Sequence, residues 1–276
     1  MSGAVTSGSE IDFSGSGNAT NWYRYDVKDN SDQKVVMHTF MYNNREMRNY
    51  TILYDRTKKA ALWAAFAMNN DVYPKLVSRA DSWHYDPALV FGTSSNPDYS
   101  WQPKLNSSYS GGYTRGHQVA SNDRKTTLYQ MYQTDYYSNM TPQTSDFNTG
   151  STSDWDELEG DIQDLGYSIT GRDTLYVVTG AIFGSGYTSD AKDVNNVTCP
   201  VPTQYYKCVM RVKFNASGQA TSAAGAAYLF DHKGSNAGTQ QNKTIKYLEQ
   251  LTGFDFFANI PSDVGDTAES TFTNLF

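Results

Sequence analysis

The chain has 276 residues, 38% of them hydrophobic and 14% aromatic, which provides enough apolar surface for a sizeable core. This composition excludes wholesale disorder, and no stretch approaches the roughly 20 apolar residues needed to cross a bilayer. The net charge of −7 argues against the broad basic face of a stoichiometric nucleic-acid binder, whereas an enzyme that releases its product needs only a local basic cleft.

The first 20 residues are rich in Gly and Ser, a composition typical of a flexible tail. We expect residues 21–276 to form a single α+β domain, because no repeat or clean linker interrupts them. Residues 1–5 lack the basic start and apolar middle of a signal peptide. The Tyr-, Asn-, Ser- and Thr-rich composition nevertheless favours a secreted or periplasmic protein whose leader has been removed, with no membrane association.

Three strand-like segments come next. Residues 35–40 and 50–54 flank a turn signal at Asn43-Asn44, and residues 62–68 form a short apolar run, so we expect a meander of antiparallel strands. Residues 71–112 carry four prolines and many Ser and Asn, which predicts long surface connections. Loops of that length in a compact domain are commonly functional.

The second half of the chain contains three more strand-like segments, at residues 174–183, 205–214 and 223–230. They are rich in β-branched and aromatic residues, and from them we expect a second sheet or half-sheet. Apolar residues at helical spacing, followed by Gly253 as a stop signal, predict a helix over 244–251.

The chain has two cysteines, Cys199 and Cys208, too few for a Cys₄ zinc site or for a disulfide-built scaffold. In an exported protein they would be close enough in sequence to pair across a turn or a strand pair. The alternative is two buried thiols, and geometry decides between the two.

The segment Tyr113-Thr-Arg-Gly-His-Gln-Val-Ala120 places Arg115 close to His117, and the basic pair Arg124-Lys125 follows. Phosphodiester hydrolysis needs a cation that holds the phosphate, a base that takes a proton from water, and a metal that offsets charge growing on the phosphoryl oxygens. Arg-Gly-His is a match of only three residues, and a lone histidine is more often structural than catalytic. The tripeptide alone therefore does not establish a catalytic site.

Further motifs follow in order: Ser138-Asn-Met-Thr-Pro-Gln143, Ser145-Asp-Phe-Asn148 and Trp155-Asp-Glu-Leu-Glu159. With them the chain resembles the DNA/RNA non-specific endonuclease family. The ββα-metal site of that family is marked by Asp-Arg-Gly-His, then Ser-Asn-apolar-Thr/Ser-Pro-Gln, then Asn and a Trp-x-x-Leu-Glu helix. The resemblance covers most of the chain after about Arg48.

The resemblance implies a ββα-metal nuclease fold, with central antiparallel sheets flanked by helices and long loops. It also implies Mg²⁺-dependent hydrolysis of DNA and RNA with little sequence preference and 5′-phosphate products, Mn²⁺ being a substitute for Mg²⁺. Members of the family can be dimeric, so a homodimer is a further expectation.

The resemblance assigns His117 as general base, a role that suits an imidazole with an ordinary pKa near 6.5. It assigns Asn148 as the single direct protein ligand of the metal, and an amide oxygen is a hard donor suited to Mg²⁺. It assigns Glu159 to the metal's water shell. The structural alternatives are a hydrogen-bonded strand histidine, an asparagine in an Asx turn and a solvated helix acid.

We expect Arg115 to contact the scissile or a neighbouring phosphate and Asn139 to orient phosphate or water by hydrogen bonding. Either residue has a structural alternative, as an ion-pair arginine or as a turn asparagine. Arg124 and Lys125 are expected to bind substrate as well.

The sequence departs from the family pattern upstream of the site. Thr114 stands where the family usually has an aspartate, an acid regarded as supporting. The position of a third family arginine falls on Asp81, and Arg79, two residues away, is expected to bind substrate by a different route.

Residues 150–153 are a further departure, because they lengthen the stretch between Asn148 and Trp155. An uninterrupted helix would place Asn148 and Glu159 about 16 Å apart along its axis, too far for a shared hydration shell. We therefore predict a loop or bulge at 150–153 that returns Glu159 toward the metal.

Two other functions remain open at this point. One is a catalytically inactive nucleic-acid-binding protein on the nuclease fold, against which the presence of His117, Asn148 and Glu159 speaks. The other is a metal-dependent phosphodiesterase with another substrate. A zinc cluster has no support, because the chain has four scattered histidines and no close His/His or Cys/His spacing.

Overall fold

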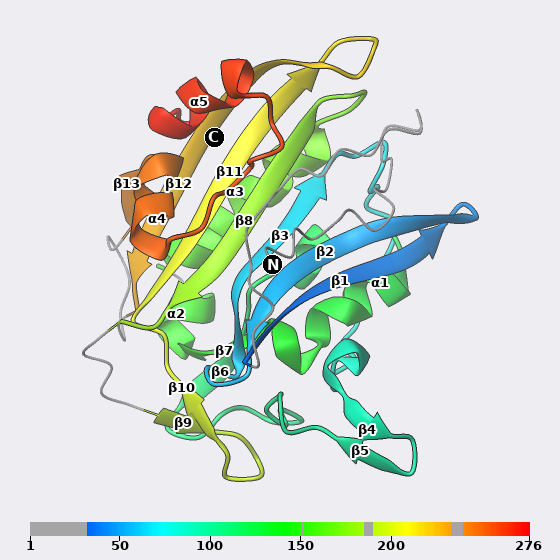
Figure 1. Ribbon diagram of the computed structural model, residues 1–276, viewed down its shortest axis with the longest axis vertical. Coiled ribbons are helices and arrows are strands. Elements are labelled where there is room, and N and C mark those ends of the chain that lie inside the picture. Colours follow the sequence, from blue (N-terminus) through cyan, green and yellow to red (C-terminus); the bar gives the residue numbers. More distant parts are fainter. Residues whose placement is uncertain (1–31, 151, 185–189, 233–239) are drawn as a thin grey trace, which may run out of the picture.

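A seven-stranded antiparallel sheet runs through the molecule in the order β1-β2-β3-β8-β11-β12-β13 (Figure 1). The computed structural model describes residues 32–150, 152–184, 190–232 and 240–276, so the expected tail at 1–20 lies outside the described residues. The strands are β1 (Gln33–Tyr42), β2 (Arg45–Asp55), β3 (Ala60–Met68), β8 (Thr174–Ile182), β11 (Gln204–Phe214), β12 (Ala220–Asp231) and β13 (Gln240–Lys243).

The expected meander is confirmed by the pairing of β1 with β2 and of β2 with β3. Asn43 and Asn44 make the first turn with φ values of 49° and 61°, a left-handed conformation that asparagine tolerates better than most residues. Of the expected second sheet or half-sheet, the half-sheet is what forms, because β8 pairs with β3 on one side and with β11 on the other. Strands from both halves of the chain therefore share one sheet.

Helices cover both faces of this sheet (Figure 1). On one face lie α4 (Ile245–Thr252) and α5 (Ser262–Ser270), whose Leu248 and Ala268 belong to a core cluster with strand side chains. On the other face lies α3 (Asp154–Ser168), which buries Trp155, Leu158 and Ile162 in a second cluster. The result is an α+β fold, as predicted.

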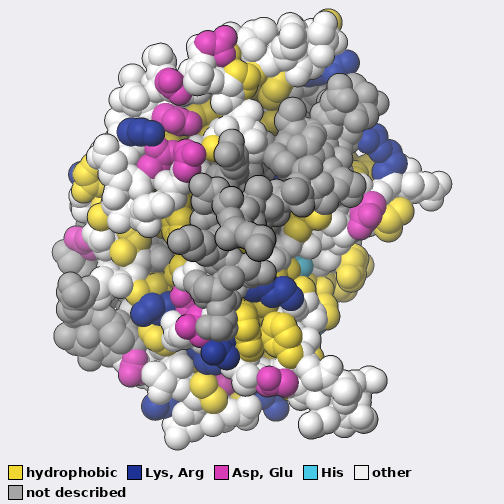
Figure 2. Space-filling view, viewed as in Figure 1, with side chains coloured by type: hydrophobic (Ala, Val, Ile, Leu, Met, Phe, Trp, Pro, Cys, Tyr) yellow, Lys and Arg dark blue, Asp and Glu magenta, His cyan; other side chains and the backbone are white. Residues whose placement is uncertain are grey.

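The predicted helix over 244–251 is α4. The Thr244 hydroxyl accepts the amide of Tyr247 at its start, and Gly253 ends it at φ 76°. Helix α5 was not predicted, since its sequence offers few apolar residues. Acidic side chains gather over α4 and α5 (Figure 2).

Residues 71–112 contain little regular structure, as predicted. They hold the 3₁₀ turn η1 (Pro87–Leu89) and a small hairpin of β4 (Phe91–Thr93) and β5 (Asn96–Asp98). Further short elements are η2 (Ser121–Asp123), α1 (Leu128–Tyr132), η3 (Gln133–Asp135), η4 (Tyr137–Asn139), β9 (Asp190–Lys192) and β10 (Thr198–Pro200).

Cys199 and Cys208 are both free and buried, and they belong to different hydrophobic clusters. Burial raises the pKa of the Cys199 thiol to about 12 and that of Cys208 well above its ordinary value. Of the two alternatives, the structure has the pair of buried thiols. None of the helices in the described ranges combines the length and apolar character of a membrane span.

Candidate active site

Two of the sequence motifs form the strands of a separate two-stranded sheet. β6 (Tyr113–His117) pairs antiparallel with β7 (Met140–Thr144), which places Thr114 opposite Gln143 and His117 opposite Met140. A Cβ added at Gly116 would lie 2.2 Å from the side chain of Gln143, which is buried, so the glycine is required by close packing. Close packing of β6 against β7 therefore fixes the position of the β6 side chains.

The helix that carries Asn148 follows β7 directly. In α2 (Ser145–Thr149), the Thr144 hydroxyl accepts the amide of Phe147. The helix stops at Thr149 and α3 begins at Asp154, which confirms the predicted interruption between Asn148 and Trp155.

Helix α3 is capped by Ser153. The Ser153 hydroxyl accepts the amide of Asp156 and donates to the carbonyl of Phe147 at 2.6 Å. These bonds tie the start of α3 to α2. As a consequence, Glu159 returns to the side of the molecule where Asn148 lies.

A cleft of about 540 Å³ brings most of the predicted site residues together. Arg79, Arg115, His117, Asn148 and Glu159 all line it, although they come from separate parts of the chain. Its other lining residues are Asp81, Trp83, Ser108, Thr114, Ala120, Ser121, Asn122, Thr149, Asp156, Gly160 and Gln163. Asn139, Arg124 and Lys125 are not among them.

His117 lies at the end of β6 with its side chain 12% exposed. Its Nε2 is 3.1 Å from Oδ1 of Asp135, a fully buried carboxylate whose other oxygen accepts the amide of Ser82 at 2.7 Å. Asp135 was not predicted. One sequence signal was available, since it is the only charged residue between Lys125 and Asp146.

Arg115 stacks on Trp83, with its guanidinium carbon 3.7 Å from the ring centroid. Its Nη1 also donates to the carbonyl of Leu105 at 3.1 Å. The indole of Trp83 lies 5.3 Å from the ring of His117, so one aromatic side chain borders both site residues. Trp83 was also not predicted as a site residue.

Asn148 is oriented by Thr114. The Thr114 hydroxyl donates its single proton to the carbonyl of Gln143 at 3.0 Å, and its oxygen accepts Nδ2 of Asn148 at 3.1 Å. The amide nitrogen is thereby committed to the protein, and Oδ1 is the atom of Asn148 that remains suited to a cation. The chemistry of this donor fits a hard metal ion such as Mg²⁺.

Glu159 is held by a buried lysine from the sheet. The ammonium of Lys207, whose side chain is 2% exposed, lies 3.2 Å from Oε1 of Glu159 and 3.8 Å from the ring centroid of Trp155. Burial raises the pKa of Glu159, and the Lys207 charge opposes that effect. Glu159 is 15% exposed, so the alternative of a freely solvated helix acid does not describe it.

The side chain of Asn139 forms hydrogen bonds with backbone groups near the site. Its Oδ1 accepts the amide of Val119 at 3.0 Å, while Nδ2 donates to the carbonyls of Val119 and Thr134 at 2.9 and 2.8 Å. The side chain is fully buried and every atom of the amide is used. It therefore holds the segment that follows His117 instead of facing the cleft.

The prediction that Arg124 binds substrate is wrong. Its guanidinium is fully buried and donates to the carbonyls of Asp123, Asn49 and Ala67 at 2.6, 3.2 and 2.8 Å. A group enclosed in this way is out of reach of a polymer in the cleft, so we assign Arg124 to the fold and not to substrate binding.

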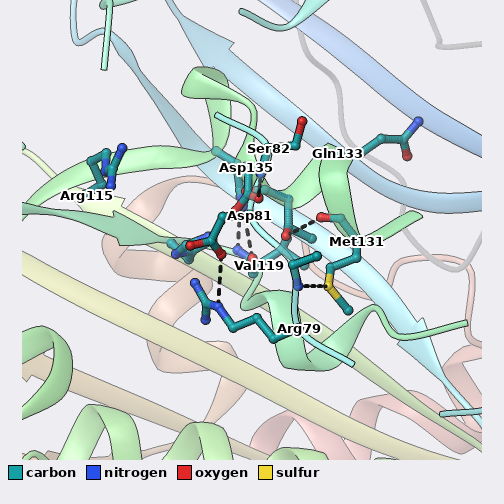
Figure 3. Close-up of polar contacts among 12 residues, drawn as sticks. Arg79, Asp81, Ser82, Arg115, Val119, Met131, Gln133 and Asp135 are labelled. Atoms are coloured by element: carbon teal, nitrogen blue, oxygen red, sulfur yellow. Dashed lines mark hydrogen bonds and ion pairs between the residues drawn. The ribbon is translucent and has the colours of Figure 1, made fainter. Parts of the chain in front are cut away.

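Arg79 and Asp81 lie together at the cleft, with the Arg79 side chain directed toward Asp81 (Figure 3). Arg79 Nε is 3.1 Å from Asp81 Oδ1, and both side chains are about half exposed, at 49% and 50%. Lys125 is half-buried, and its Nζ lies 3.5 Å from Oδ1 of Asn122, a cleft residue.

Within the described residues, no three His, Cys, Asp or Glu side chains come together as a metal-binding group. The oxygen donors that line the cleft include the amide of Asn148 and the carboxylate of Glu159. A cation held there would keep most of its ligands as water, which matches the behaviour of Mg²⁺.

Comparisons with known proteins agree with this arrangement. A family model described as DNA/RNA non-specific endonuclease matches residues 29–263. A protein named Nuclease from Nostoc sp. is 29% identical over 231 residues, covering 82% of this chain and 77% of that protein. Nuclease from Serratia marcescens is 27% identical over 250 residues, covering 87% and 80%.

Among solved structures, the crystal structure of the EndoG/EndoGI complex matches with a TM-score of 0.58 at 19% identity. The alignment covers 86% of this chain and 90% of that chain. At this identity the likeness shows the fold, which is that of the ββα-metal nucleases.

Proposed function

Because the chain belongs to the DNA/RNA non-specific endonuclease family, we propose that it is a metal-dependent endonuclease that uses His117 as general base on DNA and RNA. The observation that carries this proposal is the common cleft. His117, Arg115, Asn148 and Glu159 come from three motifs that the sequence separates, and all four line one cavity.

The pairing of His117 with Asp135 supports the base. A carboxylate 3.1 Å from Nε2 favours the tautomer with its proton on Nε2, which leaves Nδ1 free to accept a proton from water. The same carboxylate stabilises the imidazolium that results from this transfer. The water so activated attacks the phosphorus, and the 3′ oxygen leaves.

Arg115 would hold the phosphate on which this attack occurs. Its stacking on Trp83 and its bond to Leu105 fix the direction of the guanidinium before substrate arrives, which lowers the entropic cost of binding. Phosphate contacts carry no direct sequence information, and so we expect little base preference and cleavage of both DNA and RNA.

Asn148 and Glu159 are the residues that would hold the metal, Asn148 directly and Glu159 through water. The ion, for which we propose Mg²⁺ with Mn²⁺ as a substitute, would stabilise charge on the phosphoryl oxygens and on the leaving 3′ oxygen. Loss of the 3′ oxygen predicts products that end in 5′-phosphate.

The test is incubation of the purified protein with supercoiled plasmid and with structured RNA, each with Mg²⁺, with Mn²⁺ and with a chelator. Metal-dependent cleavage of both substrates, with 5′ ends that phosphatase treatment makes available to a kinase, is the expected result. A folded protein that cuts neither polymer with either metal would contradict the proposal.

A further inference from the structure

Cationic side chains continue from the cleft onto one rim. Arg79 lines the cleft, and Lys125 approaches Asn122, which also lines it, with 3.5 Å between Nζ and Oδ1. The amides of Leu76 and Val77 both donate to the carbonyl of Lys125, at 2.8 and 3.0 Å. The backbone next to Lys75 is therefore bonded to the backbone of Lys125.

Tyr167 joins Lys75 to the same rim. The Lys75 ammonium lies 5.6 Å from the centroid of the Tyr167 ring, and the Tyr167 hydroxyl donates to the carbonyl of Asn122 at 2.8 Å. Lys75, Arg79 and Lys125, which we call the basic rim, are therefore held on one scaffold beside the cleft.

The charges of the basic rim are close enough to affect one another. Burial lowers the pKa of Lys125, and the positive charges of Lys75 and Arg79 lower it further. Arg79 is paired with Asp81, and the charges that act on Lys125 are the positive ones of Lys75 and Arg79. In a chain of net charge −7, such a concentration of like charge is suited to an anion.

We propose that the basic rim is a second phosphate subsite, which binds a backbone phosphate next to the scissile one. The inference rests on the proposed function, since it takes the substrate to be a nucleic-acid strand. Lys75 and Lys125 do not line the cleft that holds His117, so we assign them to a neighbouring phosphate and not to the one that is cut. The subsite makes the enzyme favour longer strands.

The test compares the double variant Lys75→Ala/Lys125→Ala with the matched variant Lys213→Ala/Lys243→Ala. The matched variant removes the same charge from one exposed and one half-buried lysine, neither of which lines the cleft. Two readouts are needed: kcat/KM for a single-stranded dodecanucleotide relative to a dinucleotide, and binding of the dodecanucleotide in chelator, followed by fluorescence anisotropy at several salt concentrations.

For the rim variant we expect the length preference to fall about tenfold. The slope of log Kd against log salt should become shallower by about 1.4, as for the loss of two contacts to a single strand. The matched variant should keep the wild-type slope and length preference.

The binding readout separates the two proposals, because it needs no catalysis. A wild-type protein that binds the strand through the rim but never cuts it would overturn the proposed function alone. Any of three results would overturn the subsite. They are equal salt slopes in the rim variant and the wild type, equal losses of length preference in the rim and matched variants, and no binding of the dodecanucleotide by the wild type.

Discussion

The Asp135 carboxylate lies 3.1 Å from Nε2 of His117 and is fully buried beneath it. Its second oxygen accepts the amide of Ser82 at 2.7 Å, so both oxygens are committed. Asp135 therefore fixes the orientation and the tautomer of the histidine, and it links the cleft to the irregular segment that precedes β6.

Asp135→Asn should lower kcat by about 10²-fold with little change in KM. An asparagine has one acceptor oxygen in place of two, so either Nε2–H of His117 or the amide of Ser82 would face an NH₂ group. The measurement is kcat and KM on a short oligonucleotide across pH, with thermal unfolding to establish that the variant is folded. An unchanged kcat and pH profile would show that Asp135 serves the fold alone.

Trp83→Leu should reduce kcat/KM by roughly 2- to 30-fold, because it removes a cation–π contact that contributes about 0.5–2 kcal/mol. Trp83→Phe should retain most of the activity, since a ring would remain under Arg115. Trp101→Leu is the matched control, because Arg56 lies 5.5 Å from the ring centroid of Trp101 and neither residue lines the cleft. Equal losses in Trp83→Leu and Trp101→Leu would contradict a specific role for Trp83.

Thr114→Val should raise the Mg²⁺ concentration needed for half-maximal cleavage by roughly 10- to 100-fold, the usual range for partners that orient a metal ligand. Valine keeps the shape but loses the hydroxyl that accepts Nδ2 of Asn148. Thr114→Ser keeps the hydroxyl and should stay near the wild type. The same metal requirement in Thr114→Val and the wild type would show that Asn148 needs no such orientation.

Glu269→Gln should stabilise the protein above pH 7 and leave it unchanged below pH 4.5. Burial, then the charge of Glu249, raises the pKa of Glu269 from 4.5 to about 7. Between those values the folded state keeps a proton that the unfolded state loses, so the wild type loses stability as pH rises through this window and no further above it.

Thermal unfolding from pH 4 to 9 measures this difference, with exposed Glu46→Gln as the control. A melting-temperature gain that does not depend on pH would contradict the assignment.

The elements of the fold that could be predicted from the sequence are those that local sequence patterns determine. Local patterns located six of the seven strands of the large sheet and α4, because alternation, asparagine turns and a terminal glycine are determined by near neighbours. The joining of both strand groups into one sheet was missed, since it depends on the pairing of β3 with β8, more than 100 residues apart.

In the site, the motifs predicted Arg115, His117, Asn148 and Glu159, which line the cleft, and also Asn139, which does not. The partners of these residues depend on the tertiary fold. Asp135, Trp83 and Lys207 reach His117, Arg115 and Glu159 from other elements, and no local spacing marks them. Burial explains the opposite error at Arg124, whose charge suggested substrate binding although its guanidinium is enclosed by backbone carbonyls.

The most direct test of the account is chemical rescue of His117→Ala. Removal of a 12% exposed side chain from the edge of an open cleft leaves room for a free imidazole. We predict that the variant, folded as shown by its thermal unfolding, loses cleavage of plasmid and RNA by at least about 10²-fold with Mg²⁺ present. Added imidazole should restore part of that activity in proportion to its neutral fraction. Full activity in His117→Ala without imidazole would contradict the claim that His117 is the general base.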